Sequence, residues 1–216
     1  MVTLTLRQLD VPIGQRLLLR DVSWANFEAI LDELGEDRSS KIAYDNGLLE
    51  IMVPLPEHEA DKEIIGDLLK ALLEELDREF LTLGSTTFKN AEMRRGIEPD
   101  QCFYIQNEEA VRGKKRLDLS VDPPPDLALE IDITSRTHPD TYAALGVPEL
   151  WRRVGQTIRI YQLQDGQYVE VDESPTFAGW ALQTEIPNYV AQSQKEGRNK
   201  AMRAFRQWVK KMMNDE

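Results

Sequence analysis

The segment PDLALEIDI, residues 125–133, gives the main indication of the architecture. Its first half is apolar, as in a strand that is buried on both faces, and its second half alternates acidic and apolar residues. Three consecutive prolines, Pro123 to Pro125, form a stiff loop that leads into this strand. Glu130 and Asp132 point to the same face because residues i and i+2 of a strand do so. An acidic pair at the end of a buried strand is unusual, so these two residues are candidates for a functional site.

A second acidic group, Glu98-Pro99-Asp100, lies at the head of a strand predicted over residues 97–106. A neighbouring strand could bring Asp100 beside Glu130 and Asp132, where the three carboxylates would repel one another. A divalent cation relieves such repulsion, and hard oxygen ligands select Mg²⁺ or Mn²⁺. One or two such ions could be bound by this group of carboxylates. The alternative is that acidic residues at strand ends only face solvent or cap a helix.

The other elements follow from periodicity and turn residues. A helix over residues 24–34 begins after Ser23, and a longer amphipathic helix is predicted over 57–79. Asn46-Gly47 between two strand-like runs predicts a hairpin over 41–53. Further strands are predicted over residues 80–89, 150–154, 157–163 and 167–171, and helices over 138–145 and 185–213. This order indicates an α/β fold, an α+β mixed sheet flanked by helices, with a domain over 1–184 and a C-terminal helical extension over 185–216.

Composition restricts the function. The net charge of −12, from 26 Lys and Arg against 38 Asp and Glu, provides no global basic footprint for nucleic acid. The single cysteine, Cys102, excludes an internal disulfide, so a reducing cytoplasm is expected. No apolar run is long enough for a membrane span, and no secretory leader is recognised. The sequence also lacks HExxH, paired CxxC, P-loop and GxSxG motifs, so zinc, nucleotide triphosphate and serine hydrolase chemistry have no support.

Four motifs together resemble the Uma-two family, also known as domain of unknown function eight-twenty. They are Pro56-Glu57-His58, Ile97-Glu98-Pro99-Asp100, Pro125 to Ile131, and Ala144 to Trp151. Their order and spacing match over roughly residues 40 to 175 of this sequence. The family is similar to the endonucleases of the PD-(D/E)xK superfamily, which have a central mixed sheet with helices on its faces. The resemblance therefore implies a restriction-endonuclease-like fold.

The resemblance also implies roles for individual residues. Asp100 matches the aspartate and Glu130 the acidic position of the motif, and both would hold the metal. Glu57 or His58, at the start of the long helix, matches an upstream polar position that orients a metal-bound water. Asp132 would assist as a ligand or support the ligands.

The sequence departs from the pattern where a lysine is expected, because Asp132 occupies that position. Lys89, Arg136 or His138 could replace this lysine, which would stabilise negative charge on the phosphate or help to activate water. The first hypothesis is thus a metal-dependent endonuclease that hydrolyses phosphodiester bonds in nucleic acid, DNA rather than RNA. The alternative, favoured by the charge and the missing lysine, is a non-catalytic interaction or regulatory module on the same fold. A homodimer formed through the hairpins and the last helix is compatible with both hypotheses.

Overall fold

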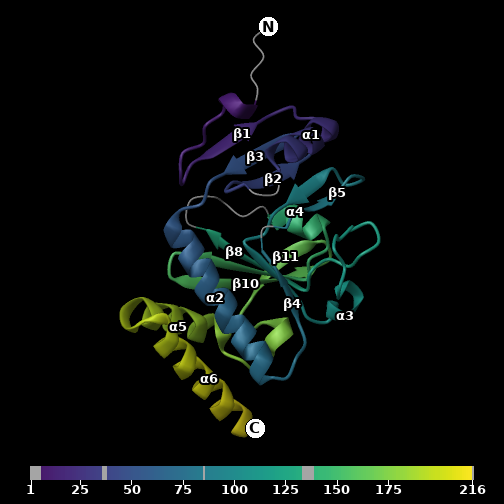
Figure 1. Ribbon diagram of the computed structural model, residues 1–216. Helices are drawn as coiled ribbons and strands as arrows, with labels where there is room; N and C mark the ends of the chain where they lie inside the picture. Colours follow the sequence, from purple (N-terminus) through teal and green to yellow (C-terminus); the bar gives the residue numbers. More distant parts are fainter. Residues whose placement is uncertain (1–5, 36–37, 85, 133–138, 216) are drawn as a thin grey trace.

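In the computed structural model, which describes residues 6–35, 38–84, 86–132 and 139–215, two β-sheets are stacked and helices cover them (Figure 1). The small sheet has five antiparallel strands in the order β1-β3-β2-β6-β5. The large sheet has six strands in the order β11-β10-β9-β8-β7-β4, and β8 and β9 are its parallel pair. The predicted α/β class with a mixed sheet flanked by helices is confirmed, with a second sheet in addition.

The elements have the following bounds. The strands are β1 (Arg16–Leu19), β2 (Lys41–Asp45), β3 (Leu48–Met52), β4 (Leu81–Leu83), β5 (Phe88–Asn90), β6 (Arg95–Ile97), β7 (Gln101–Tyr104), β8 (Leu127–Asp132), β9 (Glu149–Val154), β10 (Thr157–Gln164) and β11 (Gln167–Val171). The helices are α1 (Trp24–Leu34), α2 (Pro56–Glu75), α3 (Glu108–Val111), α4 (Pro139–Ala144), α5 (Leu182–Glu196) and α6 (Arg198–Asn214), with short 3-10 turns at Leu6–Gln8 and Pro175–Phe177.

The small sheet forms around the predicted hairpin. Asn46 and Gly47 have φ values of 45° and 99°, the left-handed turn that joins β2 to β3 with the twist of the strands. Helix α1 lies on this sheet, and the ring of Phe27 stacks on that of Tyr44 with centroids 4.5 Å apart. Ser23 accepts a hydrogen bond from the backbone N–H of Asn26 at 3.2 Å, as expected for the cap of α1.

The long helix α2 covers one face of the large sheet together with α5 and α6. Its predicted apolar stripe is confirmed, because Ile65, Leu68, Leu69 and Leu72 are fully buried. The helix ends at Glu75 rather than at residue 79, because Asp77 adopts a left-handed conformation with φ 51°. The opposite face of the sheet packs against α4 and against residues of the small sheet.

Two predicted strands are each divided between the sheets. The strand expected over 97–106 is β6 of the small sheet and β7 of the large sheet, and Glu98-Pro99-Asp100 connects them. Pro99 has no N–H to donate, so the strand does not continue through it. The strand expected over 80–89 is likewise β4 of the large sheet and β5 of the small sheet. The chain therefore crosses between the sheets at Asp100.

The C-terminal segment forms two helices, and the prediction of one helix over 185–213 is wrong. Gly197 has φ 94° and separates α5 from α6. Helix α6 packs on α2 of its own chain through the buried residues Phe205 and Val209. The domain division at 184 and the homodimer stay predictions. Across the described parts of the chain, no helix is both long and apolar enough to cross a lipid bilayer.

Candidate functional site

Asp100 directly precedes β7, and Glu130 lies on the neighbouring strand β8 of the large sheet. Gln101, the first residue of β7, pairs with Leu129 of β8 in antiparallel register. Asp100 is only 1% exposed, and its Oδ2 accepts the backbone N–H of Ile131 at 2.6 Å. The Asp100 side chain thus reaches the backbone of β8 at the residue after Glu130. The role of both carboxylates as metal ligands stays a prediction.

A lysine that the sequence analysis missed completes this group. Lys41, the first residue of β2 in the small sheet, donates from Nζ to Asp100 Oδ1. Burial lowers the pKa of Lys41 to about 8, although the carboxylate of Glu130 acts in the opposite direction. Lys41 precedes Asp100 by 59 residues, so no local spacing could have indicated the pair. The lysine that the motif places on β8 is absent, but Lys41 of the small sheet supplies an ammonium group beside Asp100.

His58, in the first turn of α2, faces the same carboxylate. Its side chain is 1% exposed and its Nε2 lies 3.0 Å from Asp100 Oδ2. The direction of approach does not suit a hydrogen bond, and Nε2 has no hydrogen-bond partner among the described residues. Burial, followed by the charge of Lys41, lowers the pKa of His58 to about 4, so the ring is neutral at pH 7. When the proton is on Nδ1, 3.3 Å from Glu59 Oε1, Nε2 is an unprotonated nitrogen that lies beside Asp100.

This arrangement fits a divalent cation with few protein ligands. In octahedral coordination with bonds of about 2.1 Å, adjacent ligand atoms lie about 3 Å apart, which matches the separation of Nε2 from Oδ2. A buried ring nitrogen without a hydrogen-bond partner is satisfied when a cation binds it. Within residues 6–35, 38–84, 86–132 and 139–215, however, no three His, Cys, Asp or Glu side chains form a complete site. The fit is therefore to an ion that keeps several water and phosphate ligands, as Mg²⁺ does.

The two carboxylates of β8 have different partners. The Tyr142 hydroxyl of α4 donates to Glu130 Oε1, and burial raises the pKa of Tyr142 well above its usual value, so it stays a donor. Asp132 forms an ion pair with Arg152 of β9, whose Nε lies 2.9 Å from Oδ2. Tyr142 orients Glu130 and was missed by the sequence analysis. Asp132 is neutralised by an arginine, which favours a supporting role over that of a metal ligand.

The remaining predicted residues are not brought to Asp100. Glu57 is exposed at the start of α2, so His58 is the residue of that motif which faces the site. Lys89 is 43% exposed on β5, and its Nζ lies 2.5 Å from Glu28 of α1. Pairing of β5 within the small sheet directs this lysine to α1. Arg136 and His138 lie outside the described residues.

Glu98 secures the strand that carries Lys41. The carboxylate is 5% exposed, and it accepts the backbone N–H of Ile42 at 3.0 Å and the Thr87 hydroxyl at 2.5 Å. Arg38 forms an ion pair with the same group. These contacts fix the beginning of β2, and therefore the position of Lys41, relative to the segment that contains Asp100.

Comparison with known protein families identifies the family of this chain. The model of the Uma2 family, described as "Putative restriction endonuclease", matches residues 24–192. The chain belongs to the Uma2 family. This membership confirms the resemblance found in the sequence motifs and supports a nuclease-like function. Among solved structures, the Uma2 chain is similar to a putative nuclease belonging to DUF820 from Anabaena variabilis, with 15% identity, a TM-score of 0.49, and coverage of 73% of this chain and 91% of that chain. No match was found among curated proteins.

Proposed function

We propose that this Uma2 protein is a metal-dependent endonuclease that hydrolyses phosphodiester bonds in nucleic acid. The observation that carries the proposal is the Lys41 ammonium on Asp100, whose carboxylate also accepts the backbone N–H of Ile131, the residue after Glu130. This ammonium supplies the cation that the PD-(D/E)xK pattern requires and that is missing two residues after Glu130. DNA remains the proposed substrate in preference to RNA.

Each residue of the site has a distinct task. Asp100 and Glu130 would hold Mg²⁺ or Mn²⁺, and His58 lies beside Asp100. The ion would neutralise phosphate charge and lower the pKa of a coordinated water. Lys41 stabilises the negative charge that develops on the phosphate. Its pKa of about 8 keeps the ammonium mostly protonated at pH 7. Tyr142 holds the Glu130 carboxylate in its orientation through a hydrogen bond.

Cleavage of supercoiled plasmid and of a single-stranded oligonucleotide, with Mn²⁺ and with Mg²⁺, tests this proposal. Asp100→Ala should abolish the metal-dependent cleavage. Lys41→Met should reduce the rate by about 100-fold, the usual effect of removing one charge-stabilising group. Lys89→Met, which removes an equal charge from an exposed ion pair, should change it by less than about twofold.

Two results would contradict the proposal. One is cleavage retained in the Asp100→Ala plus Glu130→Ala protein, which would assign the activity to a contaminant. The other is a larger loss in Lys89→Met than in Lys41→Met, with both variants folded by their melting temperatures. That result would show that Lys41 does not stabilise the charge on the phosphate.

One observation favours a second function, that of a non-catalytic module which retains the fold. The Lys41 ammonium already neutralises Asp100, so the carboxylate is stabilised without a metal. This alternative predicts that purified wild-type protein does not cut the nucleic acid substrates in the presence of Mn²⁺. If Mn²⁺ then raises the melting temperature of the wild type but not of Asp100→Ala, the metal site is present without the chemistry.

A further inference from the structure

A cavity of about 450 Å³ opens beside Lys41. The loop before β1, the segment that leads into β2, and the connection from β3 to α2 enclose it. Its apolar wall includes Ile13, Val53 and Pro54. Lys41 lines the cavity and its Nζ donates to Asp100, so this residue connects the cavity with the candidate site.

The polar wall of this cavity carries balanced charges. Arg38 and Glu98, which both line it, form an ion pair with each other. Glu59 also lines the cavity and is paired with Lys62. The hydroxyl of Ser40 adds a neutral donor and acceptor. Such a wall can hydrogen-bond a polar, uncharged ring, whereas it offers little net attraction to a row of phosphates.

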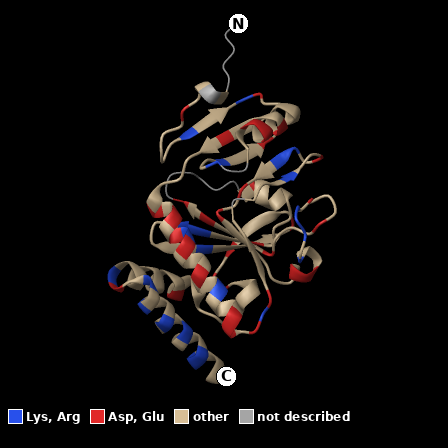
Figure 2. Cartoon of the chain, viewed as in Figure 1, with Lys and Arg blue, Asp and Glu red and all other residues tan. Residues whose placement is uncertain are grey.

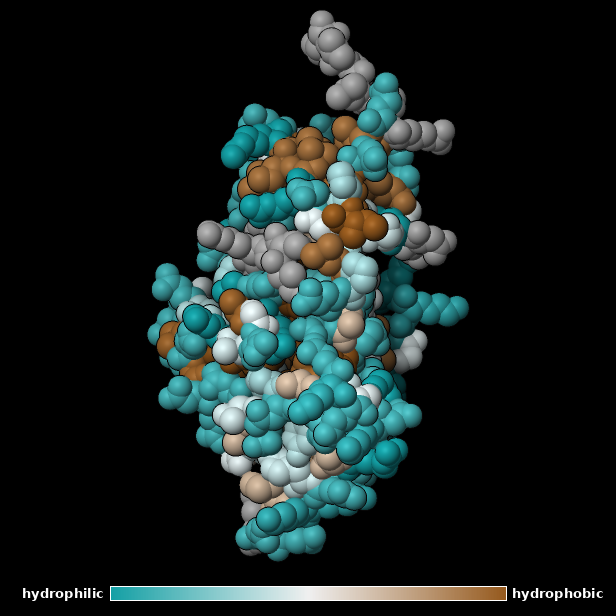
Figure 3. All heavy atoms as spheres, turned by 90° about the vertical axis from the view of Figure 1, so that its left-hand side faces the viewer, coloured by the Kyte–Doolittle hydropathy of each residue, from teal (hydrophilic) through white to brown (hydrophobic). Residues whose placement is uncertain are grey.

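The charge of the whole molecule also opposes binding of a duplex. Binding to double-stranded DNA requires several Lys and Arg contacts with phosphates, but the net charge is −12. Figure 2 shows Lys and Arg gathered on α6, where several of them pair with acidic residues of α2. Figure 3 shows apolar surface at the end of the molecule formed by the small sheet, and Ile13, at the cavity, is 65% exposed.

We infer that this cavity receives one unpaired nucleobase and that the substrate is therefore single-stranded nucleic acid. The inference rests on the proposed function, because it places the phosphate next to that base at Lys41 and Asp100. An apolar wall with a few polar groups is typical of pockets for a small ring, and the volume lies in the usual range for ligand sites. A base stacked and paired within a duplex cannot enter the cavity unless it is extruded, which costs free energy.

Binding measured without metal tests the inference separately from cleavage. Fluorescence anisotropy of a labelled single-stranded octanucleotide and of the same sequence as a duplex would be recorded in EDTA, with no cutting possible. The wild type should bind the single strand about tenfold more tightly than the duplex, because a duplex must first unpair and unstack the base that enters the cavity. Ile13→Asp places a carboxylate on the apolar wall and should weaken single-strand binding about fivefold or more.

The matched control is Val121→Asp, which adds the same charge at a residue that is 80% exposed and does not line the cavity. It should leave the single-strand affinity within about twofold. A third variant, Ser40→Trp, fills the cavity and should weaken single-strand binding as Ile13→Asp does. Melting temperatures establish that all three variants are folded.

Three results would overturn the inference: no detectable binding of single strands, a duplex bound as tightly as the single strand, or equal effects of Ile13→Asp and Val121→Asp. The protein could bind single strands preferentially, with the expected effects of these variants, and yet cut nothing with Mn²⁺. That combination would support base binding in the cavity and refute the proposed nuclease activity. The binding assay and the cleavage assay therefore distinguish a failure of the base-binding inference from a failure of the proposed nuclease activity.

Discussion

At the scale of single residues, Glu149 shows that a buried carboxylate need not be part of an active site. The side chain is 1% exposed at the start of β9. Its Oε1 accepts from Trp151 Nε1 at 2.5 Å and from the Ser174 hydroxyl at 2.6 Å. Its Oε2 accepts from the backbone N–H of Thr176 at 3.0 Å and from the Thr176 hydroxyl at 2.5 Å. Three of these four donors belong to the segment after β11, and they tie it to the centre of the large sheet.

We predict that Glu149→Gln lowers the free energy of unfolding by about 2 to 4 kcal/mol, because an amide NH₂ cannot accept the donors that face it. Urea denaturation monitored by tryptophan fluorescence measures this. Asp172→Asn, at an exposed position nearby in the sequence, makes the same chemical change and should have an effect within about 0.5 kcal/mol. Equal midpoints for the two variants would show that the Glu149 network contributes nothing.

At the scale of elements, α2 owes its position on the large sheet to a glycine in its interior. A Cβ on Gly66 would lie 1.8 Å from the Oε1 atom of Gln101, the first residue of β7. That oxygen is buried and has no hydrogen-bond partner among the described residues. The close approach brings the helix that carries His58 against the strand that follows Asp100.

We predict that the effect of Gly66→Ala depends on Gln101. Alanine favours a helix over glycine by about 1 kcal/mol, and this gain should appear in a Gln101→Ala background, where there is room for the methyl group. In the presence of Gln101, the same substitution should give no gain or a loss. A double-mutant cycle by urea denaturation measures the coupling, and an identical effect in both backgrounds would exclude the contact.

The elements that were predicted correctly are those defined by neighbouring residues. The turn at Asn46-Gly47, the cap at Ser23 and the apolar stripe of α2 all depend on interactions within a few positions of the chain. The division of the strand over 97–106 was missed, although Pro99 was a local indication of it. Strand β1 was also missed, since its pairing with β3 is a long-range contact.

The candidate site could be predicted only in part for the same reason. Asp100 and Glu130 were found because acidic residues in a strand context are conspicuous. Lys41 and Tyr142 were missed because the first comes from the other sheet and the second from a helix beyond the strand. A lysine at the start of a hairpin strand has the composition of ordinary surface. Lys89 was proposed instead, but its charge is engaged by Glu28.

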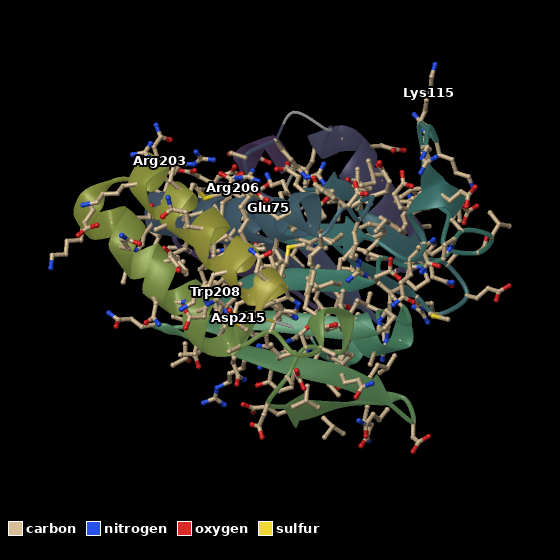
Figure 4. The ribbon with its side chains drawn as sticks, turned by 90° about the horizontal axis from the view of Figure 1, so that it is seen from below. Glu75, Lys115, Arg203, Arg206, Trp208 and Asp215 are labelled. Atoms are coloured by element: carbon tan, nitrogen blue, oxygen red, sulfur yellow. The ribbon has the colours of Figure 1, made fainter. Side chains whose placement is uncertain are left out.

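At the scale of the whole molecule, ion pairs join the C-terminal helices to the body. Arg206 of α6 lies between Glu74 and Glu75 of α2, with Nη1 2.9 Å from Glu75 Oε1 and Nη2 2.5 Å from Glu74 Oε2. Figure 4 shows Arg206 near Glu75, with Arg203 further along the same ribbon. The hydrogen bonds from the Arg206 guanidinium lower the pKa of Glu75 below its usual value.

The lowered pKa of Glu75 fixes the sign of a pH dependence. A carboxylate with a lowered pKa in the folded state stabilises the fold fully above its unfolded pKa of about 4.3, and this contribution is lost as the pH falls through the folded value. We predict that Arg206→Gln lowers the melting temperature at pH 6 and that its difference from wild type shrinks as the pH falls from about 5 towards 3. Thermal unfolding at low salt measures this.

The control for this pH series is Arg203→Gln, which removes an equal charge from an exposed position on α6. Its difference from wild type should be small and should vary little between pH 3 and pH 6. A pH-independent effect of Arg206→Gln would mean that the residue contributes through packing of its side chain and not through its charge.

The crossing of the chain at Asp100, between β6 of the small sheet and β7 of the large sheet, affects the protein during its synthesis. A growing chain that has not reached Asp100 already contains Lys41 and His58 but lacks both carboxylates of the proposed centre. Even after residue 130 is added, Lys41 meets Asp100 only when both sheets have formed and docked. Copies of the proposed nuclease that are truncated before Asp100 would therefore be unable to cleave nucleic acid.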